Sequence, residues 1–233
     1  MPDGALMHPR SGRPVEAFLF DLDGTLVDSA PDIATAINTV LLAKGYAPLD
    51  VPTVRSLIGE GIRRLTEKAF ACHGQTVSGK ELDRLTARFA EKYATCLADE
   101  TRPLHGVVES LTRFKSAGFK MAVVSNKAQV LTEQLLSQIG LTQFFDHIQG
   151  AQAGLASKPA PDMILNTLTA LGSSQDNSIF IGDSGIDIAA GNAAGIPVLL
   201  VEGGYAHGGA ALEGAFRTFS DFPQLLRWVE NSG

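Results

Sequence analysis

Short apolar runs recur along the chain, each a few residues long and bounded by Gly, Pro or polar residues. Runs of this length are typical of buried strands in a parallel sheet. Most of them precede a stretch with helical spacing of apolar residues, and an alternation of strand and helix favours an α/β fold with a parallel sheet. The predicted strands are residues 17–20, 120–124, 147–149, 178–181 and 197–201.

One segment interrupts this alternation, because no strand-like run occurs between residues 28 and 99. Helices are predicted there at 31–44, 53–73 and 79–97. In the last of them, apolar residues recur every three or four positions, at Leu82, Leu85, Phe89, Tyr93 and Cys96. We therefore expect a helical insert in an α/β domain, with 101–103 as the return linker. The predicted boundaries are a flexible tail at 1–14, a core at 15–28 and 101–233, and the insert at 29–100.

The first predicted strand ends in two carboxylates, Asp21 and Asp23, followed by Gly24. Side chains two positions apart in an extended backbone leave on the same side, so both acids point to one place. Two such carboxylates repel each other unless a cation, a shared proton or separate roles resolve the conflict. An ordinary turn or a calcium loop is the alternative, but residues 25–27 supply none of the spaced oxygen ligands of an EF-hand.

Polar side chains also follow the later strands of the predicted sheet. In open parallel sheets, ligands bind outside the carboxyl ends of the strands, so these residues can meet Asp21 and Asp23 in one crevice. They are Ser125, Asn126 and Lys127 after the second strand, Lys158 after the third, and Asp183 and Asp187 after the fourth. Taken singly, each could be a helix cap, a linker or a turn. The ordered set argues for a shared site.

The residue types in this set suit one kind of chemistry. Asp21, Asp23 and Asp183 offer the hard oxygen ligands that Mg²⁺ prefers. The hydroxyl, amide and ammonium groups that follow the later strands suit the oxygens of a phosphate. A carboxylate, a divalent ion, a Lys and a hydroxyl are the parts needed for phosphoryl transfer through an aspartyl phosphate.

Composition narrows the classes of function. Hydrophobic residues make up 45% of the 233 residues and charged residues 19%, as in an ordinary soluble globular protein. The formal net charge of −6 argues against general binding of nucleic acid or an anionic membrane. Cys72 and Cys96 lack the paired spacing of a zinc site, no apolar run is long enough to span a membrane, and the first 14 residues contain no apolar signal-peptide region. We therefore expect a cytoplasmic protein.

Four motifs taken together resemble those of the haloacid dehalogenase superfamily of phosphotransferases. Residues 21–25 resemble its first motif, Ser125 its second, Lys158 its third and residues 182–187 its fourth, and the resemblance covers nearly the whole chain after the tail. It implies a Rossmann-like α/β core with a parallel sheet of strand order 5-4-1-2-3. The helical insert resembles the small α-helical cap domain of that family, and the implied cofactor is Mg²⁺.

The resemblance also implies roles for the residues of the predicted crevice. Asp21 would be the nucleophile and Asp23 the general acid and base. Mg²⁺ would be held by the carboxylates of Asp21 and Asp183 and by the backbone carbonyl of Asp23. Asp187 would not contact the ion directly but would position Asp183 or a metal-bound water. The phosphoryl oxygens would be bound by Ser125, Asn126 and Lys158.

Within the superfamily, the chain is most similar to the bacterial phosphoglycolate phosphatases, which implies hydrolysis of 2-phosphoglycolate to glycolate. His105 stands where that branch often has Pro, and Ser125 where it often has Thr. The segments that carry the similarity are 28–32, 59–61, 125–127, 158–162 and 203–205. A cation could meet the carboxylate of such a substrate. The candidates for contact with the leaving group are Gly59, Arg63, Arg64 and Lys127.

Other functions are compatible with the same motifs. The chain could act on another small phosphomonoester or on pyrophosphate, move phosphate between sugar hydroxyls as β-phosphoglucomutase does, or be a non-catalytic binding protein on the same scaffold. Thr25 favours a hydrolase, because the mutases often have Val there, and the presence of Asp21, Asp23, Lys158 and Asp183 favours an enzyme. The expected partner is a small anionic phosphate ester, without nucleic acid or membrane, and the expected assembly is a monomer or homodimer.

Overall fold

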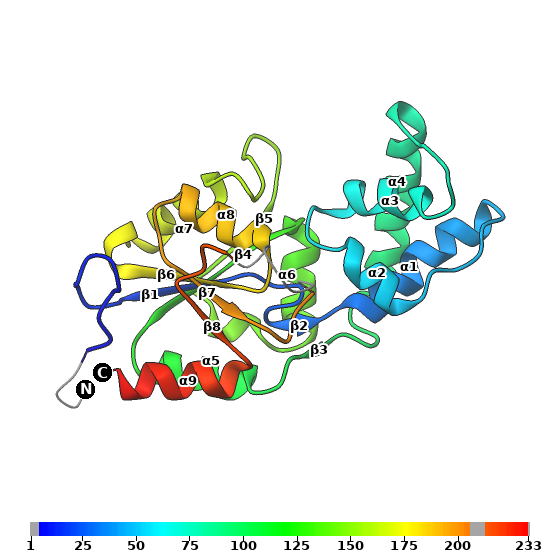
Figure 1. The fold of residues 1–233 in the computed structure, drawn as a ribbon. Helices are drawn as coiled ribbons and strands as arrows, with labels where there is room; N and C mark the ends of the chain where they lie inside the picture. Colours follow the sequence, from blue (N-terminus) through cyan, green and yellow to red (C-terminus); the bar gives the residue numbers. More distant parts are fainter. Residues whose placement is uncertain (1–4, 206–212, 233) are drawn as a thin grey trace.

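The computed structural model describes residues 5–205 and 213–232, which form an α/β core and a helical cap (Figure 1). The chain leaves the core through β2 (Val27–Asp28) and returns through β3 (Arg102–Pro103), and these strands pair antiparallel. The crossings lie next to the predicted boundaries at residues 29 and 100. Among the described residues, no helix is both long and apolar enough to cross a membrane.

A parallel sheet lies at the centre of the core. In the part of the chain that the structure describes, its strands follow the order β5-β4-β1-β6-β7-β8, and all neighbours pair parallel. The strands are β1 (Ala17–Phe20), β4 (Lys120–Ala128), β5 (His147–Ala151), β6 (Ser178–Gly182), β7 (Val198–Val201) and β8 (Arg217–Phe219). The strand order reverses at β1, which leaves a ligand crevice at the carboxyl ends of β1 and its neighbours.

The strand order predicted from the resemblance matches this sheet only in part. The order 5-4-1-2-3 is contained in it, but β8 adds a strand beside β7 that the sequence did not predict. Arg217 and Thr218 of β8 are exposed, so no apolar run marks this segment as a strand. β4 is also longer than the predicted 120–124, because it continues through Ser125 to Ala128.

The two faces of the sheet are covered by different helices, because side chains alternate along each strand. Phe18 and Phe20 of β1 belong to an apolar cluster with α5, α6 and α9, whereas Ala17 and Leu19 pack with α7 and α8. Figure 1 shows α7 and α8 on one side of the sheet and α5 and α9 on the other. The bounds of these helices are α5 (Val107–Ser116), α6 (Gln129–Gln138), α7 (Asp162–Leu171), α8 (Gly185–Ala193) and α9 (Phe222–Asn231), with 3-10 turns at Thr142–Phe144 and Gln175–Asn177.

The cap consists of α1 (Ala30–Ala43), α2 (Val51–Leu57), α3 (Ile62–Ala71) and α4 (Gly79–Thr95). The prediction of one helix over 53–73 is wrong, because the chain is interrupted between α2 and α3. Gly59 (φ 127°) and Gly61 (φ 83°) adopt backbone conformations that residues with a side chain rarely take, so one helix ends and another begins. On α4, the predicted apolar stripe is buried at Leu82, Leu85, Phe89 and Tyr93.

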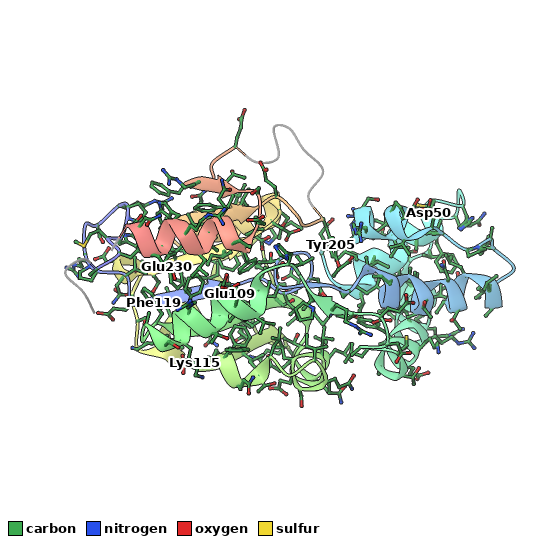
Figure 2. All side chains as sticks on the ribbon, turned by 90° about the horizontal axis from the view of Figure 1, so that it is seen from below. Asp50, Glu109, Lys115, Phe119, Tyr205 and Glu230 are labelled. Atoms are coloured by element: carbon green, nitrogen blue, oxygen red, sulfur yellow. The ribbon has the colours of Figure 1, made fainter. Side chains whose placement is uncertain are left out.

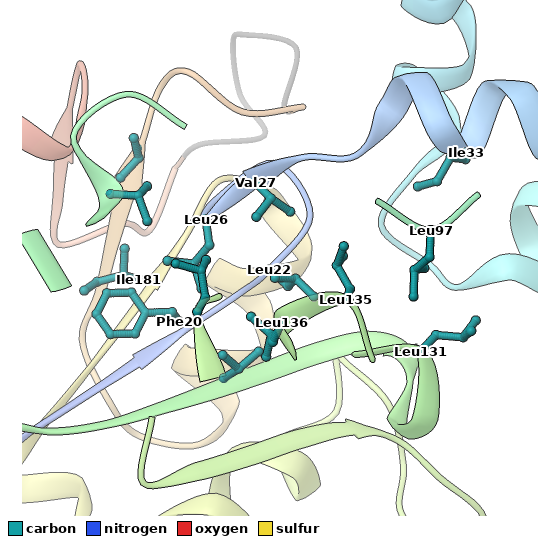
Figure 3. Close-up of a cluster of buried hydrophobic side chains, with 14 of the residues drawn as sticks. Phe20, Leu22, Leu26, Val27, Ile33, Leu97, Leu131, Leu135, Leu136 and Ile181 are labelled. Carbon is teal, nitrogen blue, oxygen red and sulfur yellow. The ribbon is translucent and has the colours of Figure 1, made fainter. Parts of the chain in front are cut away.

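The core and the cap share one buried apolar cluster (Figure 3). It extends from Phe20 on β1, through Leu22 and Leu26 in the loop that follows, to Ile33 on α1. Leu135 on α6 packs in the same cluster. These contacts hold the first cap helix close to the carboxyl ends of the strands.

The described part of the N-terminal segment, residues 5–14, contacts the core rather than forming the predicted flexible tail. Leu6 and His8 are buried, and Nε2 of His8 lies 3.2 Å from the carbonyl oxygen of Ser178 on β6. Burial lowers the pKa of His8, which favours its neutral form. The segment is attached to the core because apolar and hydrogen-bonded contacts outweigh the gain in freedom of a loose tail.

Candidate active site

The polar residues predicted to gather at the carboxyl ends of the strands line two adjoining cavities between the core and the cap. The core residues that line the first cavity are Asp21, Asp23, Ser125, Asn126 and Lys127. Those that line the second include Asp21, Asp23, Lys158, Asp183 and Asp187. Asp21 and Asp23 line both cavities, so the two acids of the first motif stand between the two spaces.

Lys158 joins the carboxylates of the second cavity. Its side chain is buried, and Nζ lies 2.7 Å from Oδ1 of Asp21 and 2.7 Å from Oδ1 of Asp187. Burial alone would lower the pKa of Lys158, but the charges of Asp187 and Asp21 outweigh it and raise the pKa above its usual value. The ammonium therefore stays charged beside Asp21.

Asp21, Asp183 and Asp187 form an acidic cluster, in which one carboxylate oxygen of each lies within 4.8 Å of the others. Burial raises the pKa of Asp21 to about 7, although Lys158 opposes the rise. Burial, followed by the charges of Asp187 and Asp21, raises the pKa of Asp183 well above its usual value. Carboxylates held this close favour a proton or a cation between them. Their hard oxygen atoms fit a divalent ion such as Mg²⁺, so this cluster is the candidate metal site.

Asp183 is held by residues from two loops. Its Oδ1 accepts a hydrogen bond from the hydroxyl of Thr25 at 3.1 Å, and its Oδ2 accepts one from the backbone amide of Tyr205 at 2.6 Å. Gly24 and Gly204 lie directly against it: a Cβ added to either would approach atoms of Asp183 to 2.5 Å and 2.3 Å. The loop after β7 therefore shapes the site, a role that the sequence did not reveal.

Asp187 organises the start of α8. Its Oδ2 accepts hydrogen bonds from the amides of Asp183 (3.2 Å) and Ser184 (3.1 Å) and from the Ser184 hydroxyl (2.7 Å). The bond from the Ser184 amide is one half of a capping box, and in the other half the Ser184 side chain accepts a hydrogen bond from the backbone amide of Asp187. Since its Oδ1 is bonded to Lys158, both oxygens of Asp187 are engaged by the protein, an arrangement that suits a residue positioning Asp183.

Asp23 is bonded to a cation on one side and a hydroxyl on the other. Its Oδ1 accepts hydrogen bonds from Nζ of Lys127 at 2.6 Å and from the hydroxyl of Ser29 at 2.5 Å. Nζ of Lys127 also donates to the hydroxyl of Tyr93 on α4, at 2.7 Å. Burial, followed by the charges of Asp23 and Asp32, raises the pKa of Tyr93 well above its usual value, so its hydroxyl stays protonated. Asp23 is thus connected to the cap, which sequence reasoning missed.

Ser125 and Asn126 directly follow the predicted strand 120–124 and lie within the longer β4. The two side chains have different hydrogen-bond partners. Oγ of Ser125 accepts a hydrogen bond from the amide of Lys127 at 3.2 Å. The side-chain amide of Asn126 donates to the carbonyl oxygens of Gly59 and Lys158, at 2.9 Å each. Asn126 therefore ties the cap loop to the loop that carries Lys158. Its Oδ1 is buried without a hydrogen-bond partner among the described residues.

The candidates for contact with the leaving group divide into two pairs. Gly59 and Lys127 line the cavities, whereas Arg63 and Arg64 are absent from the described lining residues. Both Arg side chains are exposed and pair with acids on the cap surface. The cap instead presents an apolar wall, which consists of Ile58, Ile62, Leu65 and Phe89. Of these, only Phe89 was singled out from the sequence, as part of the α4 stripe.

Comparison with known proteins places the chain in a family. Residues 18–201 match the model of the haloacid dehalogenase-like hydrolases. The chain belongs to the haloacid dehalogenase-like hydrolase family. This membership confirms the resemblance inferred from the four motifs, and with it the prediction of an enzyme of the phosphatase type.

Named relatives extend the likeness over the core and the cap. The phosphoglycolate phosphatase of Caulobacter vibrioides is 37% identical over 208 residues, which is 88% of this chain and 88% of the relative. That of Mesorhizobium japonicum is 35% identical over 193 residues, 83% of this chain and 84% of the relative. The crystal structure of a predicted phosphoglycolate phosphatase from Haemophilus somnus superposes with a TM-score of 0.83 at 28% identity, covering 92% of this chain and 97% of that one.

Proposed function

We propose that the protein hydrolyses a small phosphate monoester, 2-phosphoglycolate, to glycolate and inorganic phosphate. The observation that carries the proposal is the environment of Asp21, a buried carboxylate with Nζ of Lys158 at 2.7 Å and two further carboxylates beside it. The relatives named phosphoglycolate phosphatase support the choice of substrate. A small cavity between the core and the cap suits a small leaving group.

Mg²⁺ is the proposed cofactor. The carboxylates of Asp21 and Asp183, which lie in one acidic cluster, would hold it together with the backbone carbonyl of Asp23. When bound, the ion would offset the charge of Asp21 and stabilise negative charge on the transferred group. Asp187, bonded to the amide of Asp183 and to Lys158, would keep the ligands in place.

Asp21 and Asp23 are proposed to divide the chemistry. A carboxylate oxygen of Asp21 attacks phosphorus, the bond from phosphorus to the ester oxygen breaks, and the phosphoryl group is left on Asp21. Asp23 gives its proton to the departing ester oxygen. It then takes a proton from the water that attacks the aspartyl phosphate, which releases phosphate and restores Asp21. Ser29 and Lys127, both bonded to Oδ1 of Asp23, would hold this carboxyl group during the two steps.

The remaining site residues would bind the substrate and exclude water. Ser125 and Lys158 carry donors suited to the phosphoryl oxygens. Asn126 would assist them through its contact with the loop that carries Lys158. Of the described residues that line the first cavity, Lys127 is the only Lys or Arg, so it is our candidate for contact with a leaving-group carboxylate. Gly59 would allow the cap loop to approach closely.

We further propose a cytoplasmic location, since a reducing compartment suits the free thiols of Cys72 and Cys96. The proposed partner is a small anionic phosphate ester. The proposed assembly is a monomer or a homodimer.

Phosphate release from a panel of esters tests the proposed function. The panel contains 2-phosphoglycolate, sugar phosphates, nucleotides and pyrophosphate, each with and without Mg²⁺. We expect Mg²⁺-dependent release with a preference for 2-phosphoglycolate of about tenfold or more. In Asp21→Asn we expect a loss of about 10³-fold or more, because an amide cannot replace the carboxylate nucleophile.

Asp83→Asn is the matched control, since Asp83 is an exposed cap residue whose change should leave the rate nearly unaltered. Equal rates in Asp21→Asn and the wild type would reject the proposed mechanism. Equal rates with every ester would reject 2-phosphoglycolate as the preferred substrate but would leave the proposed mechanism in place. Formation of a new sugar phosphate in place of free phosphate would indicate a phosphotransferase.

A further inference from the structure

Tyr205, which the proposed chemistry does not use, lies where the core meets the cap (Figure 2). It follows β7, and the residue is 8% exposed. Its backbone amide donates to Oδ2 of Asp183 at 2.6 Å. One end of Tyr205 is thus attached to a proposed metal ligand, and its hydroxyl lies at the chain crossing that leads into the cap.

The hydroxyl of Tyr205 contacts three consecutive residues of this crossing. It accepts hydrogen bonds from the amides of Ser29 (2.7 Å) and Ala30 (3.0 Å), and it donates to Oδ1 of Asp28 (2.9 Å). Ser29 and Ala30 begin α1, and the first amides of a helix have no partner within the helix. Tyr205 therefore caps the first cap helix with a side chain that comes from the core.

Ser29 stands at the N-cap of α1, but in the described structure its side chain makes no capping hydrogen bond. Ser at this position commonly does so. Its hydroxyl donates instead to Oδ1 of Asp23 at 2.5 Å. Of the two amides that an N-cap side chain usually binds, one is missing, because Pro31 has no N–H. Tyr205 holds the backbone amide of Ser29, while the Ser29 hydroxyl holds the proposed acid and base. The position of Asp23 thus depends on Tyr205 through Ser29.

A second cap helix is attached to the same point. Nη2 of Arg55 on α2 donates to Oδ2 of Asp28 at 2.7 Å, and the guanidinium lies over the ring of Tyr205, 5.6 Å from its centre. The side chains of Arg55 and Asp28 are 34% and 33% exposed, so the ion pair is partly shielded from solvent and salt. Asp28 is therefore shared between a core side chain and a cap side chain.

We propose that Tyr205 is a positioning residue that couples the Asp183 loop to the cap hinge at residues 28–30. Binding of a cation and phosphate at the acidic cluster further stabilises the Asp183 loop. Through the Tyr205 hydroxyl, this stabilisation extends to the start of α1 and, through Ser29, to Asp23. Coupling between two sites is reciprocal, so closure of the cap also favours ligand binding at the cluster. The inference rests on the proposed function in assigning roles to Asp183 and Asp23.

Tyr205→Phe tests this link selectively, because it keeps the ring and the backbone amide and removes only the hydroxyl. Hydrogen exchange of a peptide covering residues 28–34 is measured on the whole protein without ligand, with Mg²⁺ alone, and with Mg²⁺ plus inorganic phosphate. In the wild type we expect Mg²⁺ with phosphate to slow exchange at the start of α1 by about tenfold or more. In Tyr205→Phe we expect faster exchange from the outset and no response to the ligands.

Tyr46→Phe is the matched control. Tyr46 lies in the cap, where its ring packs against Phe70 and His73. Loss of its hydroxyl should leave the response to ligands at residues 28–34 as in the wild type. An equal response in Tyr205→Phe and the wild type, or no response in either, overturns the proposal.

Kinetics separate positioning from a loss of stability. We expect Tyr205→Phe to lower kcat by about tenfold, because Asp23 is misplaced, and to raise KM as well, because the uncoupled cap no longer favours ligand binding. A fall in melting temperature with an unchanged kcat for the folded enzyme would show a merely structural role and overturn the proposal. The assays use p-nitrophenyl phosphate beside 2-phosphoglycolate, so a failure of the proposed substrate is distinguished from a failure of the coupling.

Discussion

The core and the cap use their charged residues in different ways. In the core, Lys158, Asp183 and Asp187 are at most 5% exposed, and each is bonded to another polar group of the site. In the cap, the side chains of Arg63 and Arg64 are 58% and 49% exposed and pair with acids on the outer surface. Buried charges are costly unless they are paired, so those of the core are held in fixed positions, whereas surface pairs contribute little.

From this difference we infer separate tasks for the two regions. The core provides a fixed set of charges, and the cap provides apolar side chains such as Ile62 and Phe89 that cover it. We therefore expect changes in the core site to lower the reaction rate, and changes on the inner face of the cap to alter KM. Substitutions in each region can separate these two effects.

Among the substitutions that compare the two regions, the largest effect is expected from Gly204→Ala in the core. A Cβ at this position would lie 2.3 Å from Cβ of Asp183 and 2.4 Å from the carbonyl oxygen of Gly24, so the site must shift. We expect kcat/KM for 2-phosphoglycolate to fall by about 10²-fold, because a displacement of about 1 Å can cost that much. Gly203→Ala is the control, since a Cβ there meets no heavy atom of the described chain within 4 Å. Similar activity in the two variants would contradict a fixed core.

A smaller loss is expected from Lys127→Met. This change removes the ammonium bonded to Asp23 and Tyr93 but keeps most of the side-chain volume. We expect kcat/KM to fall by about 10- to 100-fold, because Asp23 loses its charged partner. Lys120→Met is the control at the opposite end of β4, where Nζ bonds only to backbone carbonyl oxygens in the described structure. Equal activity in the two variants would remove Lys127 from the site.

The acidic cluster predicts a dependence of stability on pH and metal. The pKa of Asp21 rises from 3.8 to about 7 in the fold, so without metal the folded protein keeps a proton that the unfolded chain releases. The contribution of Asp21 to the free energy of unfolding is therefore fully present below about pH 4 and is lost as the pH rises through about 7. Because Mg²⁺ can replace the proton, we expect it to raise the melting temperature by about 3 °C more at pH 8 than at pH 5.

Thermal unfolding with and without Mg²⁺ at the two pH values measures this difference. Asp21→Asn is the control, since it lacks the carboxylate and should respond less at pH 8. An equal shift at both pH values in the wild type would contradict a metal site at the cluster.

The gathering of the polar core residues at one edge of the sheet could be predicted from the sequence, because each residue is marked by its local sequence. Asp21, Ser125, Lys158 and Asp183 each follow an apolar run, and a parallel sheet brings the carboxyl ends of its strands to one edge. The contacts of Tyr205 could not be predicted in this way. Its hydroxyl binds the amide of a residue 176 positions away, and no sequence pattern relates the two.

The sequence analysis missed β8 and the break between α2 and α3, but only the break could have been predicted from the sequence. β8 carries no apolar run, because it lies at the edge of the sheet and is largely exposed, so pattern analysis could not find it. The break between α2 and α3 could have been predicted from the sequence, because Gly59 and Gly61 lie inside the predicted helix 53–73 and glycine commonly ends a helix.

The smallest effect is expected from Arg63→Gln and Arg64→Gln, the two cap cations that the sequence analysis named as candidates for contact with the leaving group. Buried residues on α3 recur with helical spacing at Leu65, Thr66, Ala69 and Phe70, and this periodicity leaves both Arg on the outer face. We expect each Arg variant to keep kcat/KM within about twofold of the wild type, because exposed ion pairs contribute at most about 1 kcal/mol.

Ile62→Gln is the matched comparison, since it puts the same side chain next to Arg63 in sequence but on the apolar wall of the first cavity. There we expect KM to rise about fivefold with a smaller change in kcat, because a polar group enters the wall that covers the leaving group. Steady-state kinetics of the three variants show which face of α3 contributes to substrate binding. A larger effect from either Arg variant than from Ile62→Gln would show that the exposed face of the cap takes part in the reaction, and the division of tasks between core and cap would have to be abandoned.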